Sequence, residues 1–366
     1  MFHSAVEYFC NQLNIRLPII QAPMAGGIVT PSLISEVTLN GGLGSLPLGY
    51  LSIAESQKAI REIKTLISAP FAVNIFIPDS KSNRIQETQF RKIFDYINVH
   101  RARVGLNIYS EIPIWVEPDT NELVEMIIGE GISALSFTFG ILNSHLMSLL
   151  KRNHIFVMGT ATTVAEGLAL ESAGCDAVIA QGAEAGGHRG GDFLEGNPGE
   201  LIGTMALVPQ MVDALTVPVI ASGGIMDGRG LVAALVLGAS AVQMGTAFLT
   251  CDESNTSSMH QQKILEGHED STCITSVFTG KPVRCFKNEF VFMTEQQFHN
   301  NELLPYPLQH QLTKELRRHA NTTANVDYSG LWSGQGIRLS RSVSTRVLMS
   351  TLEKEVAAVL SQFKIP

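Results

Sequence analysis

The chain has 366 residues, of which 45% are hydrophobic and only 16% charged, and its formal net charge is −8. This composition suffices for a large core, either one large barrel with an appendage or two ordinary domains. It contains no basic tract with interleaved aromatic residues, no run of about 18 apolar residues and no basic-then-apolar N-terminus, so we expect no nucleic-acid partner, membrane span or secretory signal.

Short apolar segments rich in Val and Ile alternate with amphipathic stretches from residue 18 to about residue 250. We predict strands at 18–24, 43–48, 71–77, 132–139, 154–160, 177–182, 218–222 and 241–247. Helical stretches lie between most of them, for example 31–40, 53–67 and 163–173. Hydrophobic strands alternating with helices indicate a parallel sheet covered on both faces. About eight such units predict a TIM (β/α)8 barrel, with an open doubly wound sheet as the alternative.

Two regions interrupt this alternation. Residues 79–119 are polar and charged without a clean strand, which predicts an insertion after the third strand. After residue 250 the pattern indicates helices, at 257–267, 308–320 and 344–363. We therefore expect a barrel over residues 1–250 and a mostly helical cap over residues 251–366, packed on one end of the barrel.

The sixth predicted strand leads into a glycine-rich loop, QGAEAGGHRGG, at residues 181–191. Glycines allow a backbone to approach a flat ligand closely, and loops at the C-terminal ends of barrel strands carry the chemistry of this fold. His188 can act there as base, acid or anion partner, because histidine has an ordinary pKa of about 6.5. It can instead tie its loop to a carbonyl group. Arg189 is expected mainly to brace the loop, paired with Glu184, Asp192 or Glu195.

Other strand ends supply candidate ligand contacts. The first strand ends in Gln21-Ala22-Pro23-Met24, followed by small residues that would let a planar ring lie against the backbone. A tight turn between strand and helix is the structural alternative. Asn74 interrupts an apolar strand, so its amide needs a hydrogen-bond partner, which can be a ligand or a backbone group. The amide of Gln181 can likewise reach a heterocycle.

The last two strand ends indicate a phosphate site. Gly223 and Gly224 follow the seventh strand, and the eighth ends in Gln243, Met244, Gly245 and Thr246. Barrels often bind phosphate between these two loops, through backbone N–H groups and a helix N-terminus. The two loops therefore predict a ligand that carries a phosphate group.

In the tail, Tyr306, His310 and Lys314 are spaced four residues apart. On a helix this spacing places them on one face, which can close the barrel mouth over an anionic substrate. An ordinary solvated stripe has the same spacing.

The cysteines are scattered, odd in number and without a CxxC pair. They are Cys10, Cys175, Cys251, Cys273 and Cys285. This pattern suits neither a zinc site nor a disulfide framework, so we expect no metal and a cytoplasmic protein with reduced thiols. It is expected to be a monomer or a homodimer.

Taken together, the motifs resemble those of the nitronate monooxygenases, formerly called 2-nitropropane dioxygenases. The similar segments are PIIQAPMAGG at 18–27, FAVNIF at 71–76, QGAEAGGHRGG at 181–191, ALTVPVIASGGI at 214–225 and QMGTAFL at 243–249. The tail segments LPYPLQ at 304–309 and GLWSGQG at 330–336 resemble the class I members.

The resemblance implies an FMN-containing barrel that oxidises alkyl nitronates, typically propionate 3-nitronate, with O₂ to a carbonyl compound and nitrite. Ala22, Pro23 and Met24 would line the flavin ring, and Asn74 and Gln181 would bind its polar edges. The phosphate end would be held by Gly186, Gly187, Gly223, Gly224, Gln243, Met244, Gly245 and Thr246. His188 would be the catalytic histidine.

The sequence departs from the family pattern at Ile141, where many relatives have proline, and at His310, where an aromatic residue is expected. These departures concern the substrate more than the flavin. Two other functions fit the same motifs. One is an FMN- and NAD(P)H-dependent enoyl-acyl-carrier-protein reductase, and the other is a barrel that binds flavin without turnover.

Overall fold

The computed structural model describes residues 2–78, 86–111, 118–194 and 201–362. Its main sheet has eight parallel strands in the order β1-β9-β8-β6-β5-β4-β3-β2. These strands are β1 (Ile19–Gln21), β2 (Ser45–Pro47), β3 (Ala72–Phe76), β4 (Ala134–Thr138), β5 (Phe156–Ala161), β6 (Ala177–Gln181), β8 (Val219–Ser222) and β9 (Ala241–Met244). Each overlaps one of the eight predicted segments.

The sheet closes on itself between β1 and the residues that lead into β2. The Leu43 N–H donates to the carbonyl oxygen of Ile19 at 2.9 Å, and the Gln21 N–H donates to that of Leu43 at 3.0 Å. A parallel bridge between Ile20 and Leu43 lies at the same place. The TIM barrel is therefore confirmed, and the open sheet is wrong.

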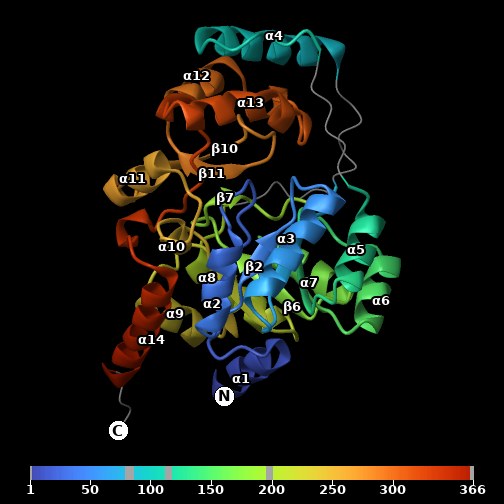
Figure 1. Cartoon of the computed structure of the whole chain (residues 1–366), viewed down its shortest axis with the longest axis vertical. Coiled ribbons are helices and arrows are strands. Elements are labelled where there is room, and N and C mark those ends of the chain that lie inside the picture. The colour runs from blue at the N-terminus through green and yellow to red at the C-terminus, as the bar shows by residue number, and fades with distance from the viewer. Residues whose placement is uncertain (1, 79–85, 112–117, 195–200, 363–366) are drawn as a thin grey trace.

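Helices surround the barrel on the outside (Figure 1). They are α2 (Pro31–Leu39), α3 (Ile53–Leu66), α5 (Thr120–Gly129), α6 (Ser144–Arg152), α7 (Val164–Ser172), α8 (Thr204–Ala214) and α9 (Gly228–Val236). The sequence sets several of their N-termini. Ser52 and Glu55 form a capping box that starts α3, in which each side chain accepts a hydrogen bond from the other residue's backbone N–H.

A helix that the sequence pattern did not predict, α1 (Phe2–Leu13), lies below the barrel (Figure 1). Phe9 is fully buried and packs edge-on against Phe156 of β5, with ring centroids 6.0 Å apart. Leu13 is buried in the same cluster as the inward residues of the strands. The helix therefore closes the end of the barrel opposite the strand C-termini.

A cap covers the other end of the barrel (Figure 1). It is formed by α4 (Glu87–Arg103), α11 (Ser258–Glu266), β10 (Thr272–Thr275), β11 (Val283–Phe286), α12 (Glu289–Gln297) and α13 (Leu308–Thr322). Its core is a second apolar cluster that includes Ile97, Phe278, Phe290 and Leu312. Because Ile97 belongs to α4, the insertion within residues 79–119 contributes to the cap; residues 79–85 and 112–117 lie outside the described part of the chain.

The tail is less helical than expected, because β10 and β11 form an antiparallel hairpin. The hairpin continues onto β7 (Gly187–His188), where Val283 pairs with His188. These strands are four and two residues long and carry polar side chains, so their local pattern did not predict them. Pairing with the histidine loop, about a hundred residues away in sequence, determines their conformation.

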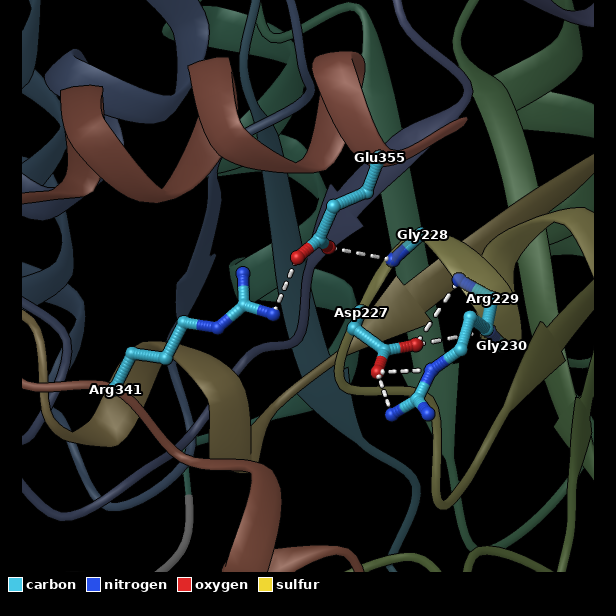
Figure 2. Close-up of polar contacts among 6 residues, drawn as sticks. All are labelled: Asp227, Gly228, Arg229, Gly230, Arg341 and Glu355. Atoms are coloured by element: carbon cyan, nitrogen blue, oxygen red, sulfur yellow. Dashed lines mark hydrogen bonds and ion pairs between the residues drawn. The ribbon is translucent and has the colours of Figure 1, made fainter. Parts of the chain in front are cut away.

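The last helix, α14 (Thr345–Gln362), belongs to the barrel rather than to the cap and packs on α9 and α2. Figure 2 shows how it is attached: Glu355 accepts hydrogen bonds from the Gly228 N–H at 2.9 Å and from Arg341 at 2.6 Å. Asp227 caps the same end of α9. The predicted boundary at residue 250 therefore does not separate the barrel from the cap, because the chain returns to the barrel with α14.

Candidate functional site

A cavity of about 410 Å³ lies between the C-terminal ends of the barrel strands and the cap. All of the predicted flavin-contact residues line it except Met244. The Met244 side chain is 1% exposed and packs in the barrel core, so it does not line the cavity. Side chains alternate between the two faces of a strand, and Met244 points to the face opposite that of Gln243.

His188 lies in the wall of this cavity, at the end of β7. Aromatic rings surround it, with centroids 5.3 Å away for Phe139, 6.2 Å for Tyr306 and 6.3 Å for Trp332. Burial lowers the pKa of His188 to about 3, and the nearby positive charges of Arg317 and Lys281 act in the same direction. His188 is therefore a neutral imidazole at physiological pH.

The Nε2 atom of His188 lies 3.1 Å from the hydroxyl oxygen of Thr279. That hydroxyl donates to the carbonyl oxygen of Lys281 at 3.0 Å. A hydroxyl group has one hydrogen, so Thr279 must accept from His188, which places the imidazole hydrogen on Nε2. Nδ1 then carries the lone pair and is the atom that can take up a proton.

The loop around His188 is held by Gln181 and Arg189. The Gln181 amide donates to the His188 carbonyl oxygen at 3.0 Å and accepts from the Gly190 N–H at 2.8 Å. Arg189 braces the loop, as predicted, by donating to the carbonyl oxygens of Gln181 and Gly182. Of the carboxylates expected to pair with it, Glu184 accepts from Thr204, and Glu195 lies outside the described residues.

The cap residues Tyr306, His310 and Lys314 do not all lie on one helix, as their spacing had predicted. α13 begins at Leu308, so Tyr306 precedes it, and only His310 and Lys314 share a helical face. Both of them line the cavity. Tyr306 is buried beside it, and its ring centroid lies 6.0 Å from that of His310. The three side chains therefore do converge on the barrel mouth.

Further residues of the cavity wall were not singled out in the sequence, among them Thr279, Arg317 and Trp332. Arg317 continues the helical spacing of His310 and Lys314, so that pattern could have identified it. Burial lowers the pKa of Arg317 to about 10, which leaves it positively charged at neutral pH. Thr279 carries no comparable signal, because only the fold brings it to His188.

The cavity has the features that a flavin nucleotide needs. Gly223 and Gly224 line it with φ angles of 120° and 71°, and their backbone N–H groups donate to no group within the described residues. Such uncovered N–H groups suit a phosphate. The Asn74 amide donates to Ser136 at 2.8 Å, while its carbonyl oxygen has no partner in the described part of the chain. That oxygen is available to a ring N–H.

Residues 9–355 match the family model described as nitronate monooxygenase. The chain belongs to the nitronate monooxygenase family. A probable nitronate monooxygenase from Staphylococcus saprophyticus is 42% identical over 353 residues, which are 96% of this chain and 97% of that protein. A solved nitroalkane oxidase from Streptomyces ansochromogenes is 32% identical with a TM-score of 0.88, covering 97% of this chain and 99% of that one. FabK from Thermotoga maritima is 26% identical with a TM-score of 0.76, covering 98% of both chains.

Membership of the nitronate monooxygenase family confirms the resemblance found in the sequence motifs. It makes the chain a flavin-dependent oxidoreductase of the class that oxidises nitronates. Among the described helices, none has the length and apolar character needed to cross a membrane.

Proposed function

We propose that this nitronate monooxygenase family member oxidises alkyl nitronates of the propionate 3-nitronate type with O₂, using FMN, to a carbonyl compound and nitrite. The observation that carries the proposal is the composition of the cavity wall. A neutral His188 lies in it together with the cationic side chains of Lys314, Arg317 and Arg318. Such a wall suits a small organic anion that reacts as a carbanion equivalent.

The residues present fit FMN. Ala22, Pro23 and Met24 would lie against the ring, and Asn74 would accept from its polar edge, while Gly223 and Gly224 would donate to its phosphate. When bound, the flavin supplies the redox chemistry by taking electrons from the nitronate and passing them to O₂.

The neutral and the cationic side chains of the cavity wall have different roles in binding the substrate. With a pKa lowered to about 3, His188 carries no charge to neutralise an anion, so that task falls to Lys314, Arg317 and Arg318. His188 instead offers the Nδ1 lone pair. It would remove the α-proton when a neutral nitroalkane enters, and it would position a nitronate without proton transfer.

The test is an assay of nitrite release and O₂ uptake on several nitronates, with and without NADH. We expect turnover that does not need NADH and a yellow protein that releases FMN on denaturation. His188→Ala should retain FMN and lose most turnover, by about 10²-fold or more, since a positioned acid–base group typically contributes that much. His145→Ala, at an exposed position on α6, is the matched control and should behave as the unmodified protein.

Two outcomes would overturn the proposal. Rapid anaerobic reduction of the flavin by NADH, with none by propionate 3-nitronate, would favour the enoyl-acyl-carrier-protein reductase alternative. Nitrite release that is absent, or unchanged in His188→Ala, would favour a barrel that binds flavin without turnover at this site.

A further inference from the structure

The side chain of His310 has a defined protonation pattern because of its contact with Arg317. The Arg317 Nη2 atom lies 3.2 Å from His310 Nδ1. A guanidinium group carries only hydrogen-bond donors, so Nδ1 must be the acceptor and bear no hydrogen. The single hydrogen of the neutral imidazole is therefore on Nε2.

The orientation of the imidazole is fixed as well. The His310 ring stacks on Tyr50 with centroids 4.5 Å apart and an interplanar angle of 12°. Arg317 is itself held in place, because its Nε atom lies 3.3 Å from the Thr313 hydroxyl and its guanidinium lies 5.9 Å from the Trp332 ring centroid. Neither side chain can turn without breaking several of these contacts.

His310 faces the cavity through the part of its ring that Arg317 does not use. The residue is 8% exposed and lines the cavity, and its Nε2 atom has no hydrogen-bond partner within the described residues. A buried N–H group costs free energy unless it is hydrogen-bonded, so this one is suited to an acceptor that enters the cavity.

We propose that Arg317 is a positioning residue that holds His310 as a permanent neutral Nε2–H donor to an oxygen atom of the anionic substrate. The identity of the substrate in this inference rests on the proposed function. The position of the hydrogen on the imidazole does not. His310 thus takes the place of the aromatic residue expected at this position. It binds the anion without acting as an acid or a base.

The surroundings of His310 keep it neutral. Burial lowers its pKa to about 2, and the positive charges of Arg317 and Lys314 on α13 and the nearby His188 on β7 act in the same direction. The other ionisable groups that face it are the phenols of Tyr50 and Tyr306. No carboxylate is among the groups that shift the pKa of His310.

The state of the imidazole can be read directly by nitrogen NMR of the holoenzyme labelled with ¹⁵N-histidine, with the His310 signals assigned by their loss in His310→Gln. We expect a bare Nδ1 and a protonated Nε2 that do not change between about pH 5 and 8. In Arg317→Met the hydrogen should be shared between Nδ1 and Nε2, because the guanidinium that keeps Nδ1 bare is gone. Arg318→Met removes a neighbouring cation of the same helix, whose side chain is 77% exposed and pairs with Glu315, and it should leave the pattern intact. A hydrogen on Nδ1, or titration in the unmodified protein, would overturn the inference.

Kinetics give an independent readout. In His310→Leu the KM for the nitronate should rise about 10-fold or more with a smaller change in kcat, because a hydrogen bond to a charged group is lost. His310→Gln keeps an N–H donor and should recover most of that loss. Arg317→Met should raise the KM by a smaller factor in the His310→Gln background than in the unmodified enzyme, because the amide N–H needs no guanidinium to fix the position of its hydrogen; equal factors in both backgrounds would refute the positioning role.

The two proposals fail in different ways. If the protein releases no nitrite from any nitronate, the proposed function fails, while the NMR result on His310 still stands or falls by itself. If nitrite is released but the imidazole titrates freely, only the role of Arg317 is wrong. Flavin content and thermal unfolding of each variant show whether a loss of activity reflects a loss of folding.

Discussion

The imidazole of His188 and the hydroxyl of Thr279 are in hydrogen-bond contact at 3.1 Å, although the two residues are 91 positions apart in the chain. One belongs to the short strand β7 at the barrel mouth, and the other precedes β11 in the cap. The pairing of β11 with β7 brings them together. The cap therefore does more than cover the barrel, because it determines which nitrogen of His188 carries the hydrogen.

Replacing Thr279 with valine should impair catalysis through His188. Without the hydroxyl the Nε2–H loses its acceptor, and the alternative form, with a hydrogen on Nδ1, becomes populated. We expect kcat/KM for neutral nitroalkanes to fall about 10- to 100-fold, because proton removal requires a bare and correctly placed nitrogen. Preformed nitronates need no proton removal and should be affected less. Thr279→Ser, which keeps the hydroxyl, should stay close to the unmodified enzyme, and equal losses in both variants would contradict this role.

The pH dependence of nitroalkane oxidation should respond to Lys281. Burial lowers the pKa of His188 to about 3, with smaller contributions from Arg317 and Lys281, so activity should be lost only as the pH falls toward that value. Removing a nearby cation makes the protonated imidazole less unfavourable. Lys281→Met should therefore raise the pKa of His188 and move the acid limb of the kcat/KM profile to higher pH. A limb that stays in place or moves down would show that Lys281 does not act on His188.

Buried histidines should make the fold less stable in mild acid. Burial lowers the pKa values of His260 and His100 to about 4. It also lowers the pKa values of the cavity histidines, His188 and His310. Between that pH and the ordinary histidine pKa of about 6.5, the unfolded chain binds protons that the folded chain does not, so the free energy of unfolding falls as the pH falls. Urea unfolding at several pH values should show this slope. In His260→Gln, which removes one such group, the slope should be smaller, and an unchanged slope would exclude His260 as a contributor.

Attachment of α14 to the barrel should depend on Gly228. A Cβ atom at this position would lie 2.4 Å from the Cβ of Glu355 and 2.7 Å from the Val356 nitrogen. Gly228→Ala should therefore cost about 1–3 kcal/mol, as is usual for overpacking. Gly129→Ala is the matched control, because nothing lies within 4 Å of its added Cβ. That control should raise stability or leave it unchanged. Thermal unfolding of both variants measures the difference, and equal effects would argue against steric contact at Gly228.

The sequence by itself determined the barrel and most of its cavity. Strands buried on both faces have continuous apolar segments, and helices have a periodic apolar face, so both elements carry their own local signal. Glycines and amides at strand ends are also local features, which is why Asn74, His188 and Gly223 were found without a structure. The alternation of side chains along β9 places Met244 in the barrel core, on the face opposite that of Gln243.

Only the tertiary structure decided what the cap does. Short strands such as β10 and β11 gain their conformation from the partners they pair with, and the second partner of β11, the strand β7, lies about a hundred residues away in the chain. The same holds for α14, which returns to the barrel through Glu355 and Gly228. The bare nitrogens of His188 and His310 depend on Thr279 and Arg317, since hydrogen bonds between side chains arise from placement in space and leave no pattern in the order of residues.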